Sequence, residues 1–227
     1  MRVLAIDTAL AACSAAVLDT VHGGLLASES QPMIRGHAEA LMPLVARVMQ
    51  AAGVAFSDLD RIVVTTGPGS FTGLRVGIAA ARGLGVATDI PVIGVSTLSA
   101  YAAPYLGADD VSPVIAAIDA RHQQVYLQVF GPGGRTLIAP KLSPLAEAIR
   151  AASETSARIV GSAAQAVADA LPASAPAPVT VDAREAPDVT WVARIGAMAP
   201  EGSAPPKPQY LRAPDAQPQN AASLPRR

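Results

Sequence analysis

The chain has 227 residues, of which 51% are hydrophobic and 15% charged, and its formal net charge is −1 at pH 7. This composition predicts a folded protein with a large core. The small net charge argues against nucleic-acid binding by this chain alone, because such binding depends on several Lys or Arg contacts to phosphate. The single cysteine, Cys13, excludes an internal disulfide, so we expect a cytoplasmic protein. The charged residues Arg75, Arg82 and Asp89 argue against a membrane-spanning helix.

The first half of the chain predicts three strands followed by alternating helices and strands. The expected elements are strands at 2–7, 13–18 and 25–30, a helix at 37–52, a strand at 61–66, a helix from 72 to about 87, and a strand at 92–95. The first three strands form a meander because the turn Gly23-Gly24 separates the second from the third. The helix at 37–52 is apolar on more than one side, so we expect it to be covered on more than one side.

The second half repeats this order. Ala5-Ile6-Asp7 recurs as Ala117-Ile118-Asp119, 112 residues later, and Arg61-Ile62-Val63 has its counterpart in Arg158-Ile159-Val160. Several elements that recur in the same order indicate a duplication. The predicted fold is therefore α/β, with duplicated βββαβα lobes of the actin, hexokinase and Hsp70 (ASKHA) type, which is ribonuclease H-like.

The expected domain boundaries follow from the duplication. They are an N-terminal lobe at 1–108, a C-terminal lobe at 109–199, and a proline-rich tail at 200–227. We expect the tail to be largely extended or disordered because it has little apolar content. Its segment 208–212 carries the one apolar anchor, through which the tail would be pinned to the body.

The segment from Thr66 to Gly77 leads into a helix with small residues at every fourth position: Gly73, Gly77, Ala81 and Gly85. Each internal glycine costs a helix about 1 kcal/mol relative to alanine, so close packing has to offset it. The stripe either packs on the protein's own sheet or forms a docking face for a second subunit. A phosphate-binding loop of the Walker type is absent, since no lysine follows Gly73.

These segments together resemble the bacterial TsaB (YeaZ) family. The matching segments are Leu4-Ala5-Ile6-Asp7-Thr8 with Ala12-Cys13-Ser14, His37 before Leu41 to Leu44, Gly67 to Gly77, Gly94 to Leu98, Ile118-Asp119-Ala120-Arg121 before Val125-Tyr126, and Tyr210-Leu211-Arg212. The resemblance implies a non-catalytic partner of TsaD, which transfers a threonylcarbamoyl group to adenosine 37 of tRNAs that read codons beginning with A. It also implies contact with the ATPase TsaE, and tRNA contact only through the complex.

The resemblance further implies that the helices at 37–52 and 72–87 pack against two similar helices of TsaD. The partner interface predicted on this basis consists of His37, Leu41, Met42, Val45, Met49, Gly73, Arg75, Gly77, Ala81 and Gly85. In the isolated protein the same apolar face is expected to form a homodimer. A leucine at Gly77 is then expected to block pairing and to leave the fold largely intact.

No metal site and no catalytic residue are predicted in this chain. Its three histidines, His22, His37 and His122, lack the four-residue spacing of a metal-binding pair. The resemblance assigns ATP and a TsaD-held metal to the complex. Asp7 and Thr8, at the end of the first strand, are candidates for a vestigial or shared nucleotide contact, although an aspartate there can equally form a turn.

Three functions from different classes are compatible with these residues: a scaffold that activates TsaD, a stand-alone ATPase or kinase of the same fold, and a peptidase. The second lobe offers only Gly161-Ser162 and lacks a Gly-Gly adenine-binding loop after it, which counts against the kinase. The peptidase would need a paired metal site or a Ser-His-Asp arrangement, and the sequence offers neither. The scaffold is the favoured function.

Overall fold

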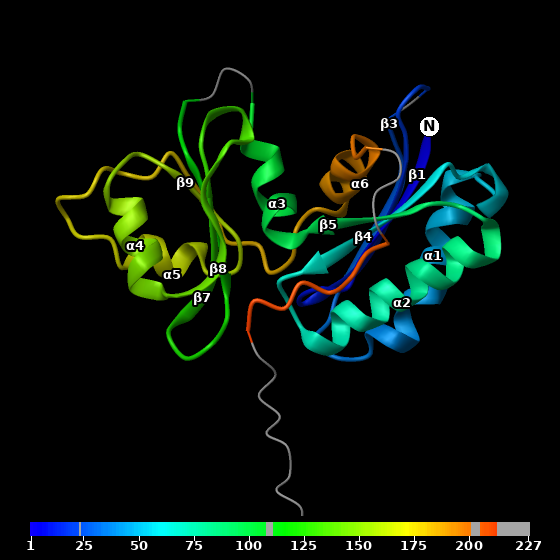
Figure 1. Cartoon of the computed structure of the whole chain (residues 1–227), viewed down its shortest axis with the longest axis horizontal. Helices are drawn as coiled ribbons and strands as arrows, with labels where there is room; N and C mark the ends of the chain where they lie inside the picture. Colours follow the sequence, from blue (N-terminus) through cyan, green and yellow to red (C-terminus); the bar gives the residue numbers. More distant parts are fainter. Residues whose placement is uncertain (23, 108–110, 201–204, 213–227) are drawn as a thin grey trace, which may run out of the picture.

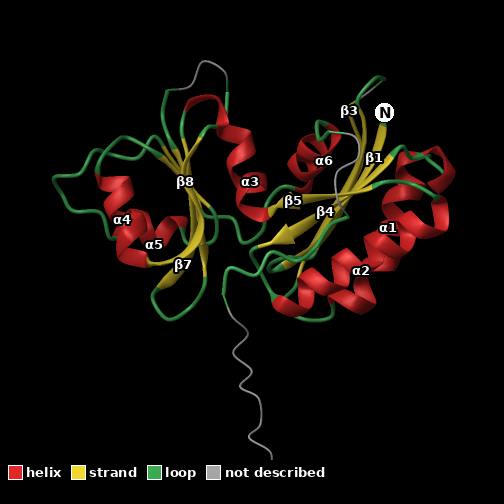
Figure 2. Cartoon of the chain, viewed as in Figure 1, coloured by secondary structure: helices red, strands yellow, loops and turns green. Residues whose placement is uncertain are grey.

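The computed structural model describes residues 1–22, 24–107, 111–200 and 205–212 and consists of two five-stranded sheets flanked by helices (Figures 1 and 2). The first sheet contains β1 (Arg2–Asp7), β2 (Ala12–Asp19), β3 (Gly24–Pro32), β4 (Arg61–Gly67) and β5 (Val92–Ser96). The second contains β6 (Val114–Asp119), β7 (Gln124–Phe130), β8 (Thr136–Pro144), β9 (Arg158–Val160) and β10 (Thr180–Asp182). The helices are α1 (His37–Ala52), α2 (Phe71–Thr88), α3 (Thr97–Ala102), α4 (Leu145–Ser153), α5 (Ala164–Asp169) and α6 (Val189–Ala197).

The strand order confirms the duplication. It is β3-β2-β1-β4-β5 in the first sheet and β8-β7-β6-β9-β10 in the second, so each strand of the second half takes the place of its counterpart in the first. In both sheets the first three strands are antiparallel and the last two run parallel to the first. The α/β, ribonuclease H-like prediction is therefore confirmed. Gly23 of the predicted turn lies outside the described residues.

The outer face of each sheet is covered by two helices. Helices α1 and α2 lie side by side on the first sheet, and α4 and α5 lie on the second (Figure 1). Helix α1 forms as predicted, with Gly53 in a left-handed conformation at its C-terminal end. Its buried stripe, with Leu41, Leu44 and Val45, packs on Leu4 and Ile6 of β1. The apolar period of the helix is thus matched to its own sheet.

The inner faces are covered by α3 and α6, which lie between the two sheets (Figure 1). Helix α6 follows the second sheet in sequence but packs on the first, where a Cβ atom at Gly196 would lie 2.3 Å from Cγ2 of Val63. Helix α3 follows the first sheet but contributes Leu98 and Tyr101 to a cluster with Ile118 of the second. The predicted boundary that assigns the segment to residue 199 to the second lobe is therefore wrong for α6.

The end of the described chain, residues 205–212, contains no helix or strand and lies against the groove between the lobes. The backbone N–H of Gln209 donates to the carbonyl of Thr66 at 2.7 Å, so the predicted pinning of segment 208–212 is confirmed. The rest of the predicted tail, residues 201–204 and 213–227, lies outside the described residues. Among the described helices, none combines the length and apolar character that crossing a bilayer requires.

Candidate functional site

The turn between β4 and α2 packs tightly on the turn after β1. Ser70 begins α2: its Oγ accepts a hydrogen bond from the N–H of Gly73 at 3.3 Å, and its own N–H donates to the carbonyl of Ala9 at 2.7 Å. A Cβ atom at Gly69 would lie 2.3 Å from the Ala9 carbonyl oxygen. Only glycine allows this approach, so the most distinctive segment of the sequence holds α2 against the first hairpin of the same chain.

The small-residue stripe of α2 faces inward. A Cβ atom at Gly73 would lie 2.1 Å from the carbonyl oxygen of Thr8, and one at Gly77 would lie 2.4 Å from Thr8 Oγ1. Gly85 approaches Val92 in the same way. Ala81 is fully buried. The prediction that these four residues form a docking face for another subunit is therefore wrong, because the stripe is buried within its own lobe.

The predicted residues of α1 divide between the core and the surface. Leu41, Val45 and Met49 lie in the core of the first lobe, so as partner contacts they are corrected to core residues. His37 is buried as well, and its Nε2 lies 3.1 Å from the carbonyl oxygen of Leu10. Met42 is 43% exposed and remains available to a partner.

Arg75 is exposed on α2 but engaged within the chain. Its Nε donates to the hydroxyl of Tyr210 at 3.1 Å, and its guanidinium carbon lies 3.7 Å from the centroid of the Phe71 ring. This arrangement combines a hydrogen bond with a cation–π contact. Arg75 thus connects α2 to the C-terminal segment of the described chain.

Asp7 and Thr8 are buried and hydrogen-bonded to the same lobe. Asp7 Oδ1 accepts from the hydroxyl of Thr65 at 2.6 Å and from the N–H of Ala9 at 3.0 Å, and Thr8 donates its hydroxyl to the carbonyl of Gly73 at 2.7 Å. Both residues are at most 1% exposed. They therefore form the turn that the alternative interpretation expected, and the predicted nucleotide contact is corrected, since neither side chain is accessible to a ligand here.

Burial raises the pKa of the Asp7 carboxyl, and the hydrogen bonds from Thr65 and Ala9 oppose this shift. The folded state holds the Asp7 proton more tightly than the unfolded state does. The contribution of this carboxyl to the free energy of unfolding is therefore fully present below the unfolded pKa of 3.8 and is lost as pH rises through the raised pKa. We expect Asp7→Asn, which keeps the acceptor oxygen and cannot ionise, to lose this component. The measurement is urea unfolding of both proteins from pH 3.5 to 8.

The free energy of unfolding of the native chain should decline relative to that of Asp7→Asn as pH rises, and then level off. Asp119→Asn is the matched control, because Asp119 ends the equivalent strand of the second lobe and is exposed. A difference between the native chain and Asp7→Asn that does not change with pH would contradict the assignment.

Sequence reasoning missed the outward face of α2. Ala79, Gly83 and Val86 lie opposite the buried stripe, and we call them the outward row of α2. Val86 is 87% exposed, and a Cβ atom at Gly83 would meet nothing within 4 Å. The signal was present in the sequence as a second pair of small residues four apart, Ala79 and Gly83, but spacing does not tell which face of the helix lies on the sheet.

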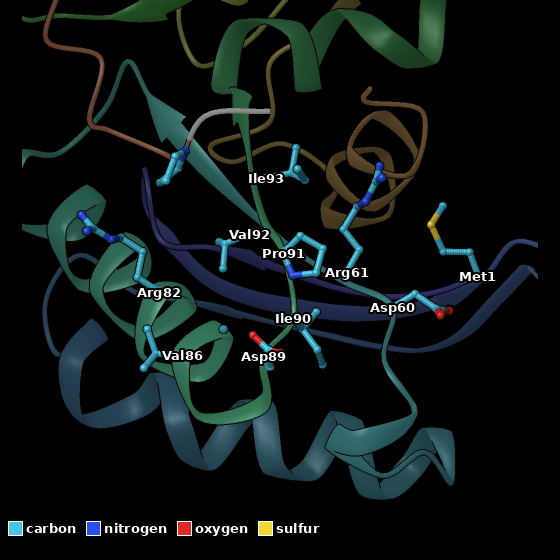
Figure 3. A pocket seen from close by; sticks show the side chains of 12 residues that line it. Met1, Asp60, Arg61, Arg82, Val86, Asp89, Ile90, Pro91, Val92 and Ile93 are labelled. Carbon is cyan, nitrogen blue, oxygen red and sulfur yellow. The ribbon is translucent and has the colours of Figure 1, made fainter. Parts of the chain in front are cut away.

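Two cavities adjoin these elements. The larger, of about 860 Å³, lies between the end of α2 and β5 (Figure 3). Arg61 lines it, but its guanidinium points toward α6, where Nη1 donates to the carbonyls of Gly196 and Ala199 at 2.7 and 2.8 Å. Within the described part of the chain no cluster of three or more His, Cys, Asp or Glu side chains is arranged to hold a metal ion.

The second cavity, of about 710 Å³, is the groove between the lobes. It lies between the turns that follow β1 and β6, and it is lined by Leu10 and Ser70 from one lobe and by Asp119 and Ser162 from the other. Asp119 Oδ1 accepts from the N–H of Arg121 at 2.8 Å. Tyr210, Leu211 and Arg212 form part of the wall. The groove is therefore bounded by the chain's own C-terminal segment.

Comparison with known proteins adds to this picture. Residues 24–184 match the family model described as TsaD, tRNA N6-adenosine threonylcarbamoyltransferase. The TsaB protein of Escherichia coli is 39% identical over 126 residues, which are 56% of this chain and 53% of that protein, so this chain spans about half the length of that relative. An uncharacterised protein of Mycobacterium tuberculosis is 34% identical over 219 residues, covering 95% of this chain and 94% of its own length.

The similarity extends to three dimensions. The structure of YeaZ from Pseudomonas aeruginosa superposes with a TM-score of 0.75 at 30% sequence identity and covers 92% of this chain and 99% of that chain. The match therefore extends over both lobes. With the sequence matches, this likeness shows that the chain belongs to the TsaB (YeaZ) family.

Proposed function

We propose that this chain is a non-catalytic scaffold subunit in tRNA threonylcarbamoyladenosine biosynthesis. In this role it binds and activates a TsaD-type transferase, which modifies N6 of adenosine 37 in tRNAs that read ANN codons. Relatives at 36–39% identity carry the name tRNA threonylcarbamoyladenosine biosynthesis protein TsaB. The observation that carries the proposal is the exposed apolar face that α1 and α2 present away from their sheet.

This face has the features of a helix-packing surface. On α2 the outward row consists of an alanine, a glycine and a valine, so another helix can approach the backbone closely. On α1, Met42 is 43% exposed and Ala46 is exposed one turn later. Exposed apolar residues on two adjacent helices favour burial against a partner, and a pair of similar helices from TsaD would complete a four-helix arrangement.

The buried Asp7 at the end of β1 supports a structural role for the first hairpin. In an ASKHA kinase, accessible acids at this position would orient a metal-bound phosphate, whereas here Asp7 is buried and bonded to Thr65 and Ala9. We infer that ATP and the metal are used by the complex, the metal being held by TsaD, and that TsaE and tRNA meet this chain only within that complex. The same helix face would pair two copies when TsaD is absent.

A single substitution on the outward row should break the complex. We expect Ala79→Arg to lower the affinity for the TsaD of the same organism at least about tenfold, because a long charged side chain would be buried in an apolar helix contact. Complex formation is measured by light scattering after gel filtration, and the affinity by isothermal titration calorimetry. ATP hydrolysis by the chain alone is assayed in parallel.

Ala166→Arg is the matched control, since Ala166 is an exposed alanine on α5 in the other lobe. It should bind TsaD as the native chain does. Equal binding by Ala79→Arg would refute the assignment of the surface. Hydrolysis of ATP by the native chain without a TsaD complex would favour the alternative function, a stand-alone ATPase or kinase of this fold.

A further inference from the structure

The segment Gln209–Arg212 bridges the two lobes within four residues. At its start, the N–H of Gln209 donates to the carbonyl of Thr66 at the end of β4, at 2.7 Å. At its end, Arg212 Nη1 donates to the carbonyl of Ala120, directly after β6, at 2.9 Å. One bond thus reaches each lobe, and both acceptors are backbone carbonyls.

The two side chains in the middle also divide between the lobes. The Tyr210 ring lies 5.1 Å from the ring of Phe71, at the start of α2, and its hydroxyl accepts from Arg75. Leu211 packs against the cluster that α3 and the second sheet form around Tyr101. Tyr210 thus contacts the first lobe and Leu211 the second, so one short segment holds both lobes at once.

The surface of the first lobe is shaped for this segment. A Cβ atom at Gly67, where φ is +112°, would lie 2.9 Å from the carbonyl oxygen of Gln209. A Cβ atom at Gly94 would lie 3.1 Å from Cβ of Pro206. Two glycines from different strands therefore leave room for the path of the C-terminal segment, which points to a specific seat rather than to an incidental contact.

The contacts are few enough to be reversible. Tyr210 remains 43% exposed and Leu211 is only partly buried. Each net hydrogen bond in water is worth about as much as the conformational entropy lost when one residue is ordered, so a four-residue segment with these contacts is close to balance. We propose that Gln209–Arg212 is an intramolecular strap that docks reversibly in the inter-lobe groove and limits how far the two lobes open.

The experiment measures the distance between the lobes in the full chain. Spin labels are attached at Gln50→Cys on α1 and Ala166→Cys on α5, both exposed, while the native Cys13 is fully buried and does not react. Distances are read by double electron–electron resonance, with labelled protein diluted in unlabelled protein to remove distances between molecules. Leu211→Ser should broaden the distribution and shift it to longer distances, because the strap loses its apolar anchor.

Arg212→Gln is a second variant, since it removes the bond to Ala120 from the end of the strap without altering the lobe cores. Leu137→Ser is the matched control, because Leu137 is 47% exposed on β8. A synthetic peptide with the sequence of residues 205–212 should restore the narrow distribution in Leu211→Ser. Unchanged distributions in both strap variants, equal broadening in Leu137→Ser, or no effect of the peptide would overturn the proposal.

Discussion

We expect the substitution Gly73→Ala to lower the free energy of unfolding by about 3 kcal/mol relative to the native chain. This value is in the upper part of the range for overpacking a core. The added Cβ atom would lie 2.1 Å from the carbonyl oxygen of Thr8. The obstacle is backbone, which cannot rotate away, so the helix has to shift or the turn after β1 has to move. Urea unfolding followed by circular dichroism measures the loss.

The same substitution ten residues along the same helix should have the opposite sign. Gly83 has nothing within 4 Å of the position of a Cβ atom, so Gly83→Ala gains up to about 1 kcal/mol of helix propensity without a clash. Comparing Gly73→Ala with Gly83→Ala therefore separates the effect of close packing on stability from that of helix propensity. Stabilisation by Gly73→Ala, or equal losses in both variants, would contradict the inward orientation of the stripe.

The same close packing overturns the expectation for Gly77→Leu. As a variant that blocks pairing and leaves the fold intact it is unsuitable, because its side chain would meet Thr8 Oγ1 at 2.4 Å from the first carbon onward. We expect it to impair folding, so loss of partner binding in that variant would say nothing about the interface. Substitutions on the outward row of α2 avoid this ambiguity.

The second large effect is expected at Arg61. Its guanidinium is buried, and its Nη1 donates to the carbonyls of Gly196 and Ala197 at the end of α6, at 2.7 and 3.2 Å, and to that of Ala199 just beyond the helix, at 2.8 Å. Arg61→Met keeps much of the volume and removes every donor, so the carbonyls of Ala197 and Ala199 lose their bond to Arg61 and that of Gly196 keeps, within the described residues, only the 3.3 Å bond from the N–H of Ala199. We expect a loss of about 2–3 kcal/mol in the free energy of unfolding.

The loss should be accompanied by faster amide exchange in α6, because Arg61 is the group that fixes the end of this helix on the first sheet. Arg82→Met is the matched control, since Arg82 lines the same cavity (Figure 3) but is exposed on α2. It should change stability by less than about 0.5 kcal/mol. A similar loss in the control, or unchanged exchange in α6, would show that Arg61 does not hold the helix.

Much of the secondary structure follows from local patterns. The helix at His37–Ala52 was predicted with its observed bounds, because an apolar period of 3.6 residues and a closing glycine are local features. The strands β1 and β9 likewise match their predicted ranges. In contrast, no pattern indicated that α6 crosses back to the first sheet, because that position depends on Val63 and Arg61, far away in the sequence.

The sequence by itself determined the duplicated α/β fold, since the order of its elements recurs and each element carries its own hydrophobic period. It also predicted that α2 packs closely along the stripe, because close packing offsets the cost of the three glycines there, Gly73, Gly77 and Gly85. Only the tertiary structure decided what the stripe packs against. Residues four apart share a helix face, and α2 carries small residues four apart on two faces, so local spacing does not distinguish Gly73 and Gly77, which pack on Thr8, from Ala79 and Gly83, which lie on the open face.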